Sequence, residues 1–375
     1  MTVKPRRKFD RAAFMRRHWQ REPLLLRGAF PGFVDPLSPR DVLTLAGDED
    51  AISRLVVRHG KRWSVEHGPI PPSRFKQLPR RDWTVLVQDT NHFSHAAAQL
   101  LAQFDFIPHA RIDDVMVSYA APGGGVGPHV DSYDVFLLQG RGKRRWSISR
   151  QQDLAFVPGL DLKILARFRP EQEWVLEPGD MLYLPPGIAH HGVAETECLT
   201  WSIGFRAPTD EELVHGFLDF LRDRLAPVGH YGDPGERPVR HPGAIPPRWM
   251  GHAAQAMRAV RWSDRDIRAF AGQFLSEPKS HVYFTAPKRP LSRAQFERRA
   301  ASSGVALDPR SRLVFSGTMF FLNGDEVRVP APARKTLRRL ADHRGLEAPV
   351  RAPRSFWDAA HEWYLRGFVK TGEAP

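Results

Sequence analysis

One short stretch of the chain carries an imidazole and a carboxylate at a spacing typical of metal ligands. His129 and Asp131 lie two residues apart in a segment whose pattern indicates an extended conformation. Side chains along a strand alternate between its two faces, so residues i and i+2 point the same way. With a second histidine from elsewhere, such a pair forms the two-histidine, one-carboxylate triad that holds Fe(II) and leaves positions open. The sequence therefore predicts an iron site around this pair.

A later region supplies the best candidate for the missing ligand. Residues 177–190 read Glu-Pro-Gly-Asp-Met-Leu-Tyr-Leu-Pro-Pro-Gly-Ile-Ala-His, so a Pro-Gly-Asp turn opens a short strand and Pro-Pro-Gly ends it. His190 follows that stop, far enough from Asp131 for the chain to cross a barrel and return. The neighbouring His191 is an alternative ligand, and either histidine could instead be an ordinary surface residue. The order of the motifs favours His190.

An arginine is predicted to point into the same barrel. Strand alternation places Arg144 on the face of Trp146 and Ile148, which is apolar and therefore inward. A buried charge must be paired, and a guanidinium grips a carboxylate through two parallel hydrogen bonds. We expect the partner to be the carboxylate of a small cosubstrate, with an internal salt bridge as the alternative. The hydroxyls of Ser118 and Thr200, on neighbouring strands, could bind the same carboxylate.

Two further residues are candidates for contacting a substrate. Tyr133 lies two residues beyond Asp131 and shares its face, and Asp114 begins the strand that leads to the glycine loop 122–127. A carboxylate beside an aromatic ring is a good receptor for a guanidinium. We therefore predict that both residues bind a cationic side chain. The alternatives are that Tyr133 packs inside the barrel and that Asp114 caps a turn.

The elements around these residues indicate a mainly β domain with added helices. Short strands separated by glycine and proline turns fill residues 114–205, one of them over 130–139, which predicts a barrel or a sandwich. Helical spacing precedes them at 9–20 and 92–104. We expect residues 1–208 to form one catalytic domain.

Helices dominate the rest of the chain. Residues 209–278 are expected to form a helical segment, with Thr209 as an N-cap, a proline-rich linker at 226–247 and a helix over 248–275. Its first helix needs a partner surface for an apolar stripe, which we expect a second copy of the chain to provide, with packing inside one chain as the alternative. The stripe consists of Leu213, Phe217, Phe220 and Leu221.

The last unit, residues 279–375, combines helices with a hairpin and resembles a winged helix. A strand over 312–322 and another over 326–329 flank Asn323-Gly324, a strong turn signal. A serine-capped helix over 292–301 precedes them, and helices over 333–343 and 355–369 follow.

Composition limits the setting and the partners. Among the 375 residues, no apolar run is long enough for a membrane span, and the basic N-terminus lacks the apolar core of a secretory signal. The single cysteine, Cys198, excludes an internal disulfide, which fits a reducing cytoplasm. A net charge of +13 favours acidic partners. We expect no dedicated nucleic-acid binding, and at most a weak attraction to RNA near the true substrate.

The motifs, taken in order, resemble the JmjC-type, cupin-like 2-oxoglutarate oxygenases. The branch they resemble most is the bacterial ribosomal oxygenases, which hydroxylate an arginine of the sixteenth protein of the large ribosomal subunit. The strings that carry the resemblance are His-x-Asp at 129–131, Gly-x-Gly-Lys-Arg-Arg-Trp at 140–146, the motif at 177–190, and the shorter stretches 17–23, 111–114, 122–135 and 204–208. The resemblance is specific over residues 9–208 and looser beyond them.

The resemblance implies a double-stranded β-helix barrel, a helical dimerisation segment and a winged-helix-like tail. It implies that His129, Asp131 and His190 bind Fe(II), and that 2-oxoglutarate is anchored on Arg144, with Ser118 and Thr200 beside it. Relatives often carry an amide where Thr200 stands, so that contact is expected to differ here.

We therefore predict an Fe(II)- and 2-oxoglutarate-dependent hydroxylase that modifies an arginine β-carbon of a ribosomal protein. The alternatives are a JmjC oxygenase that acts on a histidine of another ribosomal protein, and a cupin-like binding protein without catalysis.

Overall fold

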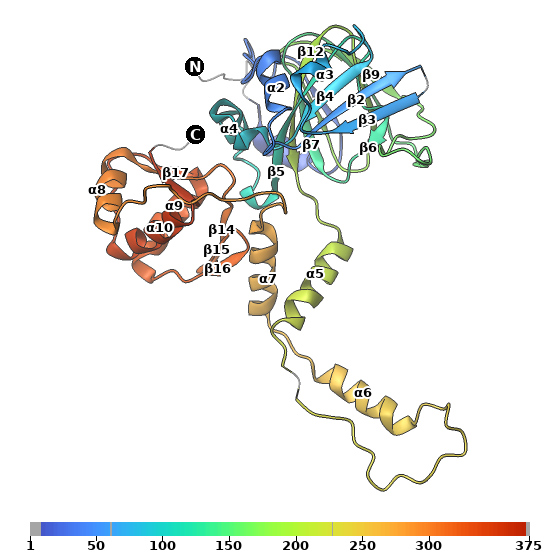
Figure 1. Ribbon diagram of the computed structural model, residues 1–375, viewed down its shortest axis with the longest axis vertical. Coiled ribbons are helices and arrows are strands. Elements are labelled where there is room, and N and C mark those ends of the chain that lie inside the picture. Colours follow the sequence, from blue (N-terminus) through green and yellow to red (C-terminus); the bar gives the residue numbers. More distant parts are fainter. Residues whose placement is uncertain (1–8, 61, 227, 373–375) are drawn as a thin grey trace.

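The computed structural model describes residues 9–372, apart from 61 and 227, and Figure 1 shows how its parts are arranged. A body of short strands, coloured blue to green, lies at one end of the molecule. A smaller unit of helices and strands, coloured orange to red, lies beside it. The helices α5 (Asp210–Arg222) and α6 (Pro247–Ala259) extend away from both, and α6 lies farthest out.

Two antiparallel sheets form the barrel. The larger has the order β1-β10-β7-β12-β5-β4-β2-β3 and the smaller the order β6-β11-β8-β9. Their strands are β1 (Leu24–Leu26), β2 (Ser53–His59), β3 (Arg62–His67), β4 (Trp83–Val87), β5 (Ile112–Ala120), β6 (His129–Val130), β7 (Asp134–Gln139), β8 (Arg144–Ser149), β9 (Gln172–Leu176), β10 (Met181–Leu184), β11 (Ala189–Ala194) and β12 (Cys198–Phe205). This arrangement confirms the expected mainly β, cupin-like barrel.

Strand β7 shows how alternation divides the core. Val135 and Leu137 point toward the smaller sheet and join a cluster with Trp146 of β8. Phe136 and Leu138 point the other way, into the larger core that includes the barrel's helices. Every residue of β7 is buried, because both faces of this central strand are covered.

Helices cover the outer face of the larger sheet. They are α1 (Arg11–Arg17), α2 (Pro39–Leu45), α3 (Pro72–Phe75) and α4 (His95–Ala102), with 3-10 turns η1 (Thr90–His92) and η2 (His109–Arg111). Phe14 of α1 packs its ring edge-on against Tyr183 of β10, with centroids 4.9 Å apart. Aromatic packing therefore fixes the N-terminal helix to a strand that leads to the predicted third ligand.

The expected strand over 130–139 is wrong as a single element. Strand β6 ends at Val130 and belongs to the smaller sheet, whereas β7 begins at Asp134 and belongs to the larger sheet. The chain must bend at 131–133 to cross from one sheet to the other. A run of alternating residues does not reveal such a crossing, because the hydrophobic pattern continues on both sides of it.

The described residues of the helical segment, which leave out 227, form three helices rather than two. The helix expected over 248–275 is divided into α6 and α7 (Asp264–Ser276), because Val260 is already extended and Ser263 begins a new capping box with Asp266. The rings of Phe217 and Phe220 in α5 lie 5.5 and 5.8 Å from that of Phe270 in α7. Part of the predicted apolar stripe thus packs within the chain.

The C-terminal unit has the expected winged-helix character, with two corrections. The helix expected over 355–369 ends at Leu365, because Gly367 turns the chain with a positive φ into a short strand that begins at Val369. The strand expected over 312–322 is a hairpin, β14 (Leu313–Ser316) and β15 (Met319–Leu322), because Gly317 turns the chain with a positive φ. The turn at Asn323-Gly324 then leads into β16 (Asp325–Val327), as predicted. The remaining elements are α8 (Arg293–Ser303), α9 (Arg334–His343), α10 (Arg354–Leu365), η3 (Ala331–Ala333), β13 (Val305–Leu307), β17 (Gly345–Leu346) and β18 (Val369–Thr371).

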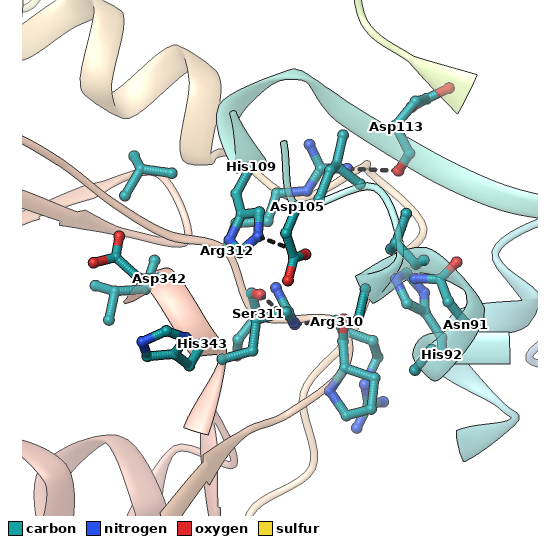
Figure 2. Close-up of a pocket in the computed structure, with 18 residues that line it drawn as sticks. Asn91, His92, Asp105, His109, Asp113, Arg310, Ser311, Arg312, Asp342 and His343 are labelled. Carbon is teal, nitrogen blue, oxygen red and sulfur yellow. Dashed lines mark hydrogen bonds and ion pairs between the residues drawn. The ribbon is translucent and has the colours of Figure 1, made fainter. Parts of the chain in front are cut away.

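The C-terminal unit rests against the barrel. A cavity of about 60 Å³ lies where the two meet. Charged and imidazole side chains from both parts line it (Figure 2). Arg312, just before β14, donates from Nη2 to the carbonyl oxygen of Asp113 in β5 at 3.0 Å. His109 of η2 contacts the carbonyl oxygen of Ala341 in α9 at 3.1 Å. Of the helices that the structure describes, none is both long and apolar enough to cross a membrane.

Candidate functional site

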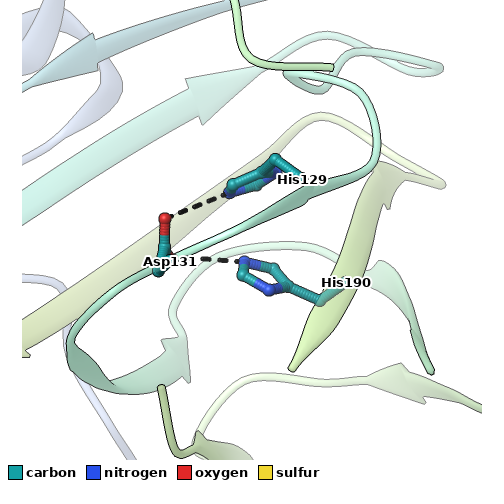
Figure 3. Close-up of side chains that lie close together, drawn as sticks. All are labelled: His129, Asp131 and His190. Atoms are coloured by element: carbon teal, nitrogen blue, oxygen red, sulfur yellow. Dashed lines mark ion pairs between the residues drawn. The ribbon is translucent and has the colours of Figure 1, made fainter. Parts of the chain in front are cut away.

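The structure brings the three predicted metal ligands together. Both imidazoles point at the carboxylate of Asp131 (Figure 3), with His129 Nε2 3.8 Å from its Oδ1 and His190 Nε2 3.6 Å from its Oδ2. One possible ligand atom from each residue lies within 4.8 Å of the other two. A metal ion placed among these atoms would be bound on one face only, which is the arrangement of a facial triad.

Strand pairing sets the positions of the two histidines. His129 in β6 and His190 in β11 are direct partners across an antiparallel ladder, and their rings lie 4.2 Å apart. Asp131 follows the end of β6, at the bend where the chain leaves the sheet. His191, the alternative ligand, alternates to the other face of β11 and packs its ring against Phe168.

The ring nitrogens that face away from the triad are already engaged. His129 Nδ1 lies 3.0 Å from the carbonyl oxygen of Gly127, and His190 Nδ1 lies 2.9 Å from that of Ile188. A carbonyl can only accept, so each Nδ1 carries the proton and each Nε2 presents a lone pair to the triad. Burial also lowers the pKa of His190 to about 4, which keeps its ring neutral. The donor set therefore fits a divalent transition metal such as Fe(II).

Arg144 lies inside the barrel, as its alternation predicts, and is only 3% exposed. Its Nη1 donates to Ser118 Oγ at 3.1 Å and to Thr200 Oγ1 at 3.4 Å, and its Nη2 donates to the carbonyl oxygen of Gly192 at 3.2 Å. Nε has no hydrogen-bond partner within the described part of the chain.

No acidic side chain among the described residues forms a salt bridge with Arg144, so the alternative of an internal ion pair finds no support there. Burial lowers the pKa of this guanidinium. A buried charge that lacks its counter-charge is unfavourable, and the carboxylate of a bound small molecule would supply one.

Gln139 belongs to the same group, although no sequence pattern indicates this position for it. Its Oε1 accepts a hydrogen bond from Thr200 Oγ1 at 3.1 Å, and its side chain is fully buried. Gln139 on β7 is the direct partner of Thr200 on β12, so its amide lies beside the threonine hydroxyl. Relatives often carry an amide at the position of Thr200, and in this chain the neighbouring strand supplies one.

Asp114 and Tyr133 lie on either side of Gly204. A Cβ atom added to this glycine would be 3.5 Å from Asp114 Oδ1 and 3.8 Å from Tyr133 Cδ2. Burial raises the pKa of the Tyr133 hydroxyl, and the nearby negative charges of Asp131 and Asp114 raise it further. Tyr133 therefore links the predicted metal site to the carboxylate predicted to bind substrate, despite the bend in the chain between β6 and β7.

The Asp114 carboxylate is not isolated. Lys279, which follows α7, places its Nζ 3.3 Å from Asp114 Oδ2, 3.2 Å from Asp113 Oδ1 and 3.1 Å from Asp89 Oδ1. His281 contacts the other oxygen of Asp89 at 2.9 Å. Sequence reasoning missed Asp89, Asp113, Lys279 and His281, because the partners come from distant parts of the chain and no local motif joins them.

A double-stranded β-helix with a two-histidine, one-carboxylate triad and an inward arginine defines the JmjC-type class of cupin-like proteins. Residues 99–213 match the family described as JmjC domain, and residues 259–370 match the ROXA-like winged helix.

Individual relatives extend the similarity over nearly the whole chain. The "Ribosomal protein uL16 3-hydroxylase" of Escherichia coli is 34% identical over 337 residues, which is 89% of each chain. A crystal structure of E. coli YcfD covers 99% of this chain and 100% of its own, at 32% identity and a TM-score of 0.86. Another, of YcfD, "a Ribosomal oxygenase", in complex with cobalt and 2-oxoglutarate, covers 98% and 99%, at 31% identity and a TM-score of 0.82. This chain belongs to the family of JmjC ribosomal oxygenases.

Proposed function

We propose that this protein is an Fe(II)- and 2-oxoglutarate-dependent dioxygenase that hydroxylates ribosomal protein uL16 at the β-carbon of an arginine. The observation that carries the proposal is the pairing of two incomplete sites. One is a triad with lone pairs directed at a common point, and the other is a buried arginine whose described partners are all uncharged. The name of the E. coli relative, a uL16 3-hydroxylase, supports the choice of substrate protein.

The residues of the chain divide the work between them. His129, Asp131 and His190 would hold Fe(II), while Arg144, with Ser118 and Thr200, would hold the far carboxylate of 2-oxoglutarate. With O2 as the oxidant, the bound metal and cosubstrate would supply the chemistry needed to break an unactivated C–H bond. The protein supplies placement and a surrounding from which water is largely excluded, since Arg144, His190 and Thr200 are each at most 3% exposed.

Recognition of a cationic side chain falls to Asp114 and Tyr133 in this proposal. A carboxylate can accept two hydrogen bonds from a guanidinium, and a phenol ring beside it can stack on the flat cation. A neutral histidine would make less use of a carboxylate at this position. The acidic group formed by Asp89, Asp113 and Asp114 therefore supports arginine over histidine as the target.

The remaining assignments are also proposals. We infer that residues 1–208, 209–278 and 279–375 are the three functional units, that the second mediates homodimerisation, and that the enzyme works in the cytoplasm, where ribosomes are assembled. Attraction to ribosomal RNA, in keeping with the net charge of +13, would assist the encounter without contributing a specific contact.

Two measurements test the proposed activity. Mass spectrometry of uL16 from cells with and without the gene is expected to differ by one oxygen atom on an arginine, and identical spectra would contradict the choice of substrate. Anaerobic addition of Fe(II) and 2-oxoglutarate to the purified protein is expected to give the weak visible absorption of a chelated complex. Without that band the chain would be a binding protein rather than an oxygenase.

A further inference from the structure

Lys279 occupies the back of the acidic group that the proposed function assigns to the substrate. Its Nζ lies within 3.3 Å of three carboxylates, and its side chain is only 18% exposed. The lysine comes from the joint that connects α7 to the C-terminal unit, whereas Asp89, Asp113 and Asp114 all come from the barrel. This cation does more than join two parts of the molecule, because Asp114, one of its partners, lies close to Tyr133, and Tyr133 in turn lies close to Asp131.

The two oxygens of Asp114 have different surroundings. Oδ2 accepts the backbone N–H of Asp89 at 3.2 Å and lies 3.3 Å from Lys279 Nζ. Oδ1 lies toward Gly204 and Tyr133, and within the described ranges no hydrogen bond reaches it. Oδ2 is thus held by Asp89 and Lys279, whereas Oδ1 can accept a hydrogen bond from a group on the side of the triad.

We propose that Lys279 is a positioning residue for substrate binding, which fixes the Asp114 carboxylate with Oδ1 directed at the cationic side chain to be hydroxylated. This inference rests on the proposed function, since it requires a substrate that presents a cation. It makes the joint after α7 part of the substrate site, so that the C-terminal unit contributes to recognition. The guanidinium does not displace the lysine, because the two cations use different oxygens of Asp114.

The charge state of Asp114 agrees with this role. Burial raises its pKa to about 6, and the nearby Lys279 ammonium opposes that rise. Asp114 is therefore ionised at neutral pH and loses its charge as the pH falls through about 6. Without Lys279 the pKa would be higher, and a larger fraction would be neutral at pH 7. The charged or titratable groups around it are Asp89, Asp113, Tyr133 and Lys279, with His92 and His281 beside Asp89 and Arg312 beside Asp113.

The test compares Lys279→Met with wild type in the full-length protein loaded with Fe(II) and 2-oxoglutarate. Binding of a fluorescent uL16 peptide that contains the target arginine, measured without oxygen, is expected to weaken about tenfold or more at pH 7. The loss is expected to shrink as the pH is raised to 8.5, because Asp114 becomes ionised again. With oxygen, KM for the peptide is expected to rise far more than kcat falls. Iron and 2-oxoglutarate affinities should stay near the wild-type values.

Matched variants separate positioning from general damage. Lys279→Arg keeps the charge and is expected to restore most of the affinity, while Lys288→Met removes an exposed lysine from the same joint and should have no effect. If Lys279→Met does not fold, the double variant Lys279→Met/Asp89→Asn removes one negative charge along with the positive one. This double variant is expected to show the same loss of peptide affinity and the same recovery of affinity at high pH.

Three kinds of result would overturn the inference: unchanged affinity, increased affinity, and a loss that lacks either the expected rescue or the expected pH dependence. Unchanged affinity in Lys279→Met would make the lysine only a structural link, and increased affinity would make it a competitor of the substrate. A loss that Lys279→Arg does not restore, or that does not depend on pH, would also exclude positioning through Asp114. If the wild-type protein neither binds nor hydroxylates the peptide, the proposed function fails first, and this result is distinct from the other three.

Discussion

At the scale of single residues, Arg144 allows a direct test of the cosubstrate site. Replacing it with methionine removes the charge but leaves an apolar chain of similar length. We expect 2-oxoglutarate affinity to fall about 100-fold or more, since losing one partner of a buried charge pair costs several kcal/mol, while Fe(II) affinity changes little. Anaerobic titration of the visible band, with each component varied in turn, measures both.

The neighbouring arginine provides the control for that experiment. Arg145 points outward and is bonded to Glu173 and Glu195, so Arg145→Met should affect neither affinity by more than a small factor. Equal losses of iron and 2-oxoglutarate in Arg144→Met would mean that Arg144 supports the barrel and does not bind the cosubstrate.

Gly204 offers a second test, because it lies between Asp114 and Tyr133. An added methyl group would be in ordinary contact with its neighbours, 3.5 Å from Asp114 Oδ1, so Gly204→Ala should fold. The methyl group would occupy space next to the oxygen left for the substrate. We expect the affinity for the uL16 peptide to fall about tenfold, with 2-oxoglutarate binding preserved, as measured by anisotropy and titration. Peptide affinity equal to that of wild type would show that the substrate does not pass this glycine.

The local sequence pattern was sufficient to predict some of these site residues but not others. The i, i+2 spacing and the motif at 177–190 were enough to select His129, Asp131 and His190, and strand alternation was enough to turn Arg144 inward. Lys279 could not be selected in this way. It follows α7, which packs on the sheet of the C-terminal unit, and only the packing of the joint against the barrel brings it to Asp114.

At the scale of elements, the contact between α7 and β15 depends on a glycine. A Cβ atom on Gly272 would lie 2.2 Å from ring atoms of Phe321, so the helix can approach the sheet only because that atom is missing. Gly272→Ala is expected to destabilise the protein by about 1–3 kcal/mol, as overpacked sites generally do. Chemical denaturation followed by circular dichroism measures this.

A second glycine gives the opposite expectation. Gly251 in α6 has open space around its missing Cβ. Gly251→Ala should leave stability unchanged or raise it by up to about 1 kcal/mol, because alanine favours helix over glycine. If Gly272→Ala and Gly251→Ala changed the free energy of unfolding equally, the close approach of α7 to β15 would not affect stability.

Elements were predicted best where a capping residue or a turn marks their ends. Thr209 and Ser292 each begin a helix as expected, and Asn323-Gly324 turns between two strands. The misplaced boundaries lie at 131–133, 260–263, 317–318 and 366–368. At each of these places the hydrophobic pattern continues while the chain changes direction, and the direction is set by tertiary packing.

At the scale of the whole molecule, the helical segment exposes apolar side chains whose contact with water is unfavourable. They include Val214, Leu218, Trp249, Met250, Met257, Trp262 and Ile267, each at least 45% exposed. We expect a homodimer of twice 42.6 kDa, held through this segment. Met250→Glu combined with Met257→Glu, two helical turns apart on α6, should yield monomers by light scattering.

The barrel supplies a control for the dimer experiment. Val34 is 76% exposed there, so Val34→Glu adds a similar charge away from the helical segment and should leave the mass unchanged. A wild-type protein that runs as a monomer at micromolar concentration would contradict the dimer. The seven exposed side chains would then need another partner.

The ladder between β8 and β11 has one more consequence, which concerns errors of folding. Six residue pairs fix these strands, and the pairs place His190 opposite Ile148 and the next histidine opposite Ser147. A slip by one residue would exchange the faces of the whole strand. His191 would then face Asp131, and His190 would be turned away. The slipped barrel would still offer two histidines and a carboxylate, but against the wrong neighbours. Correct pairing of two short strands therefore decides which of two adjacent, chemically identical side chains becomes the ligand.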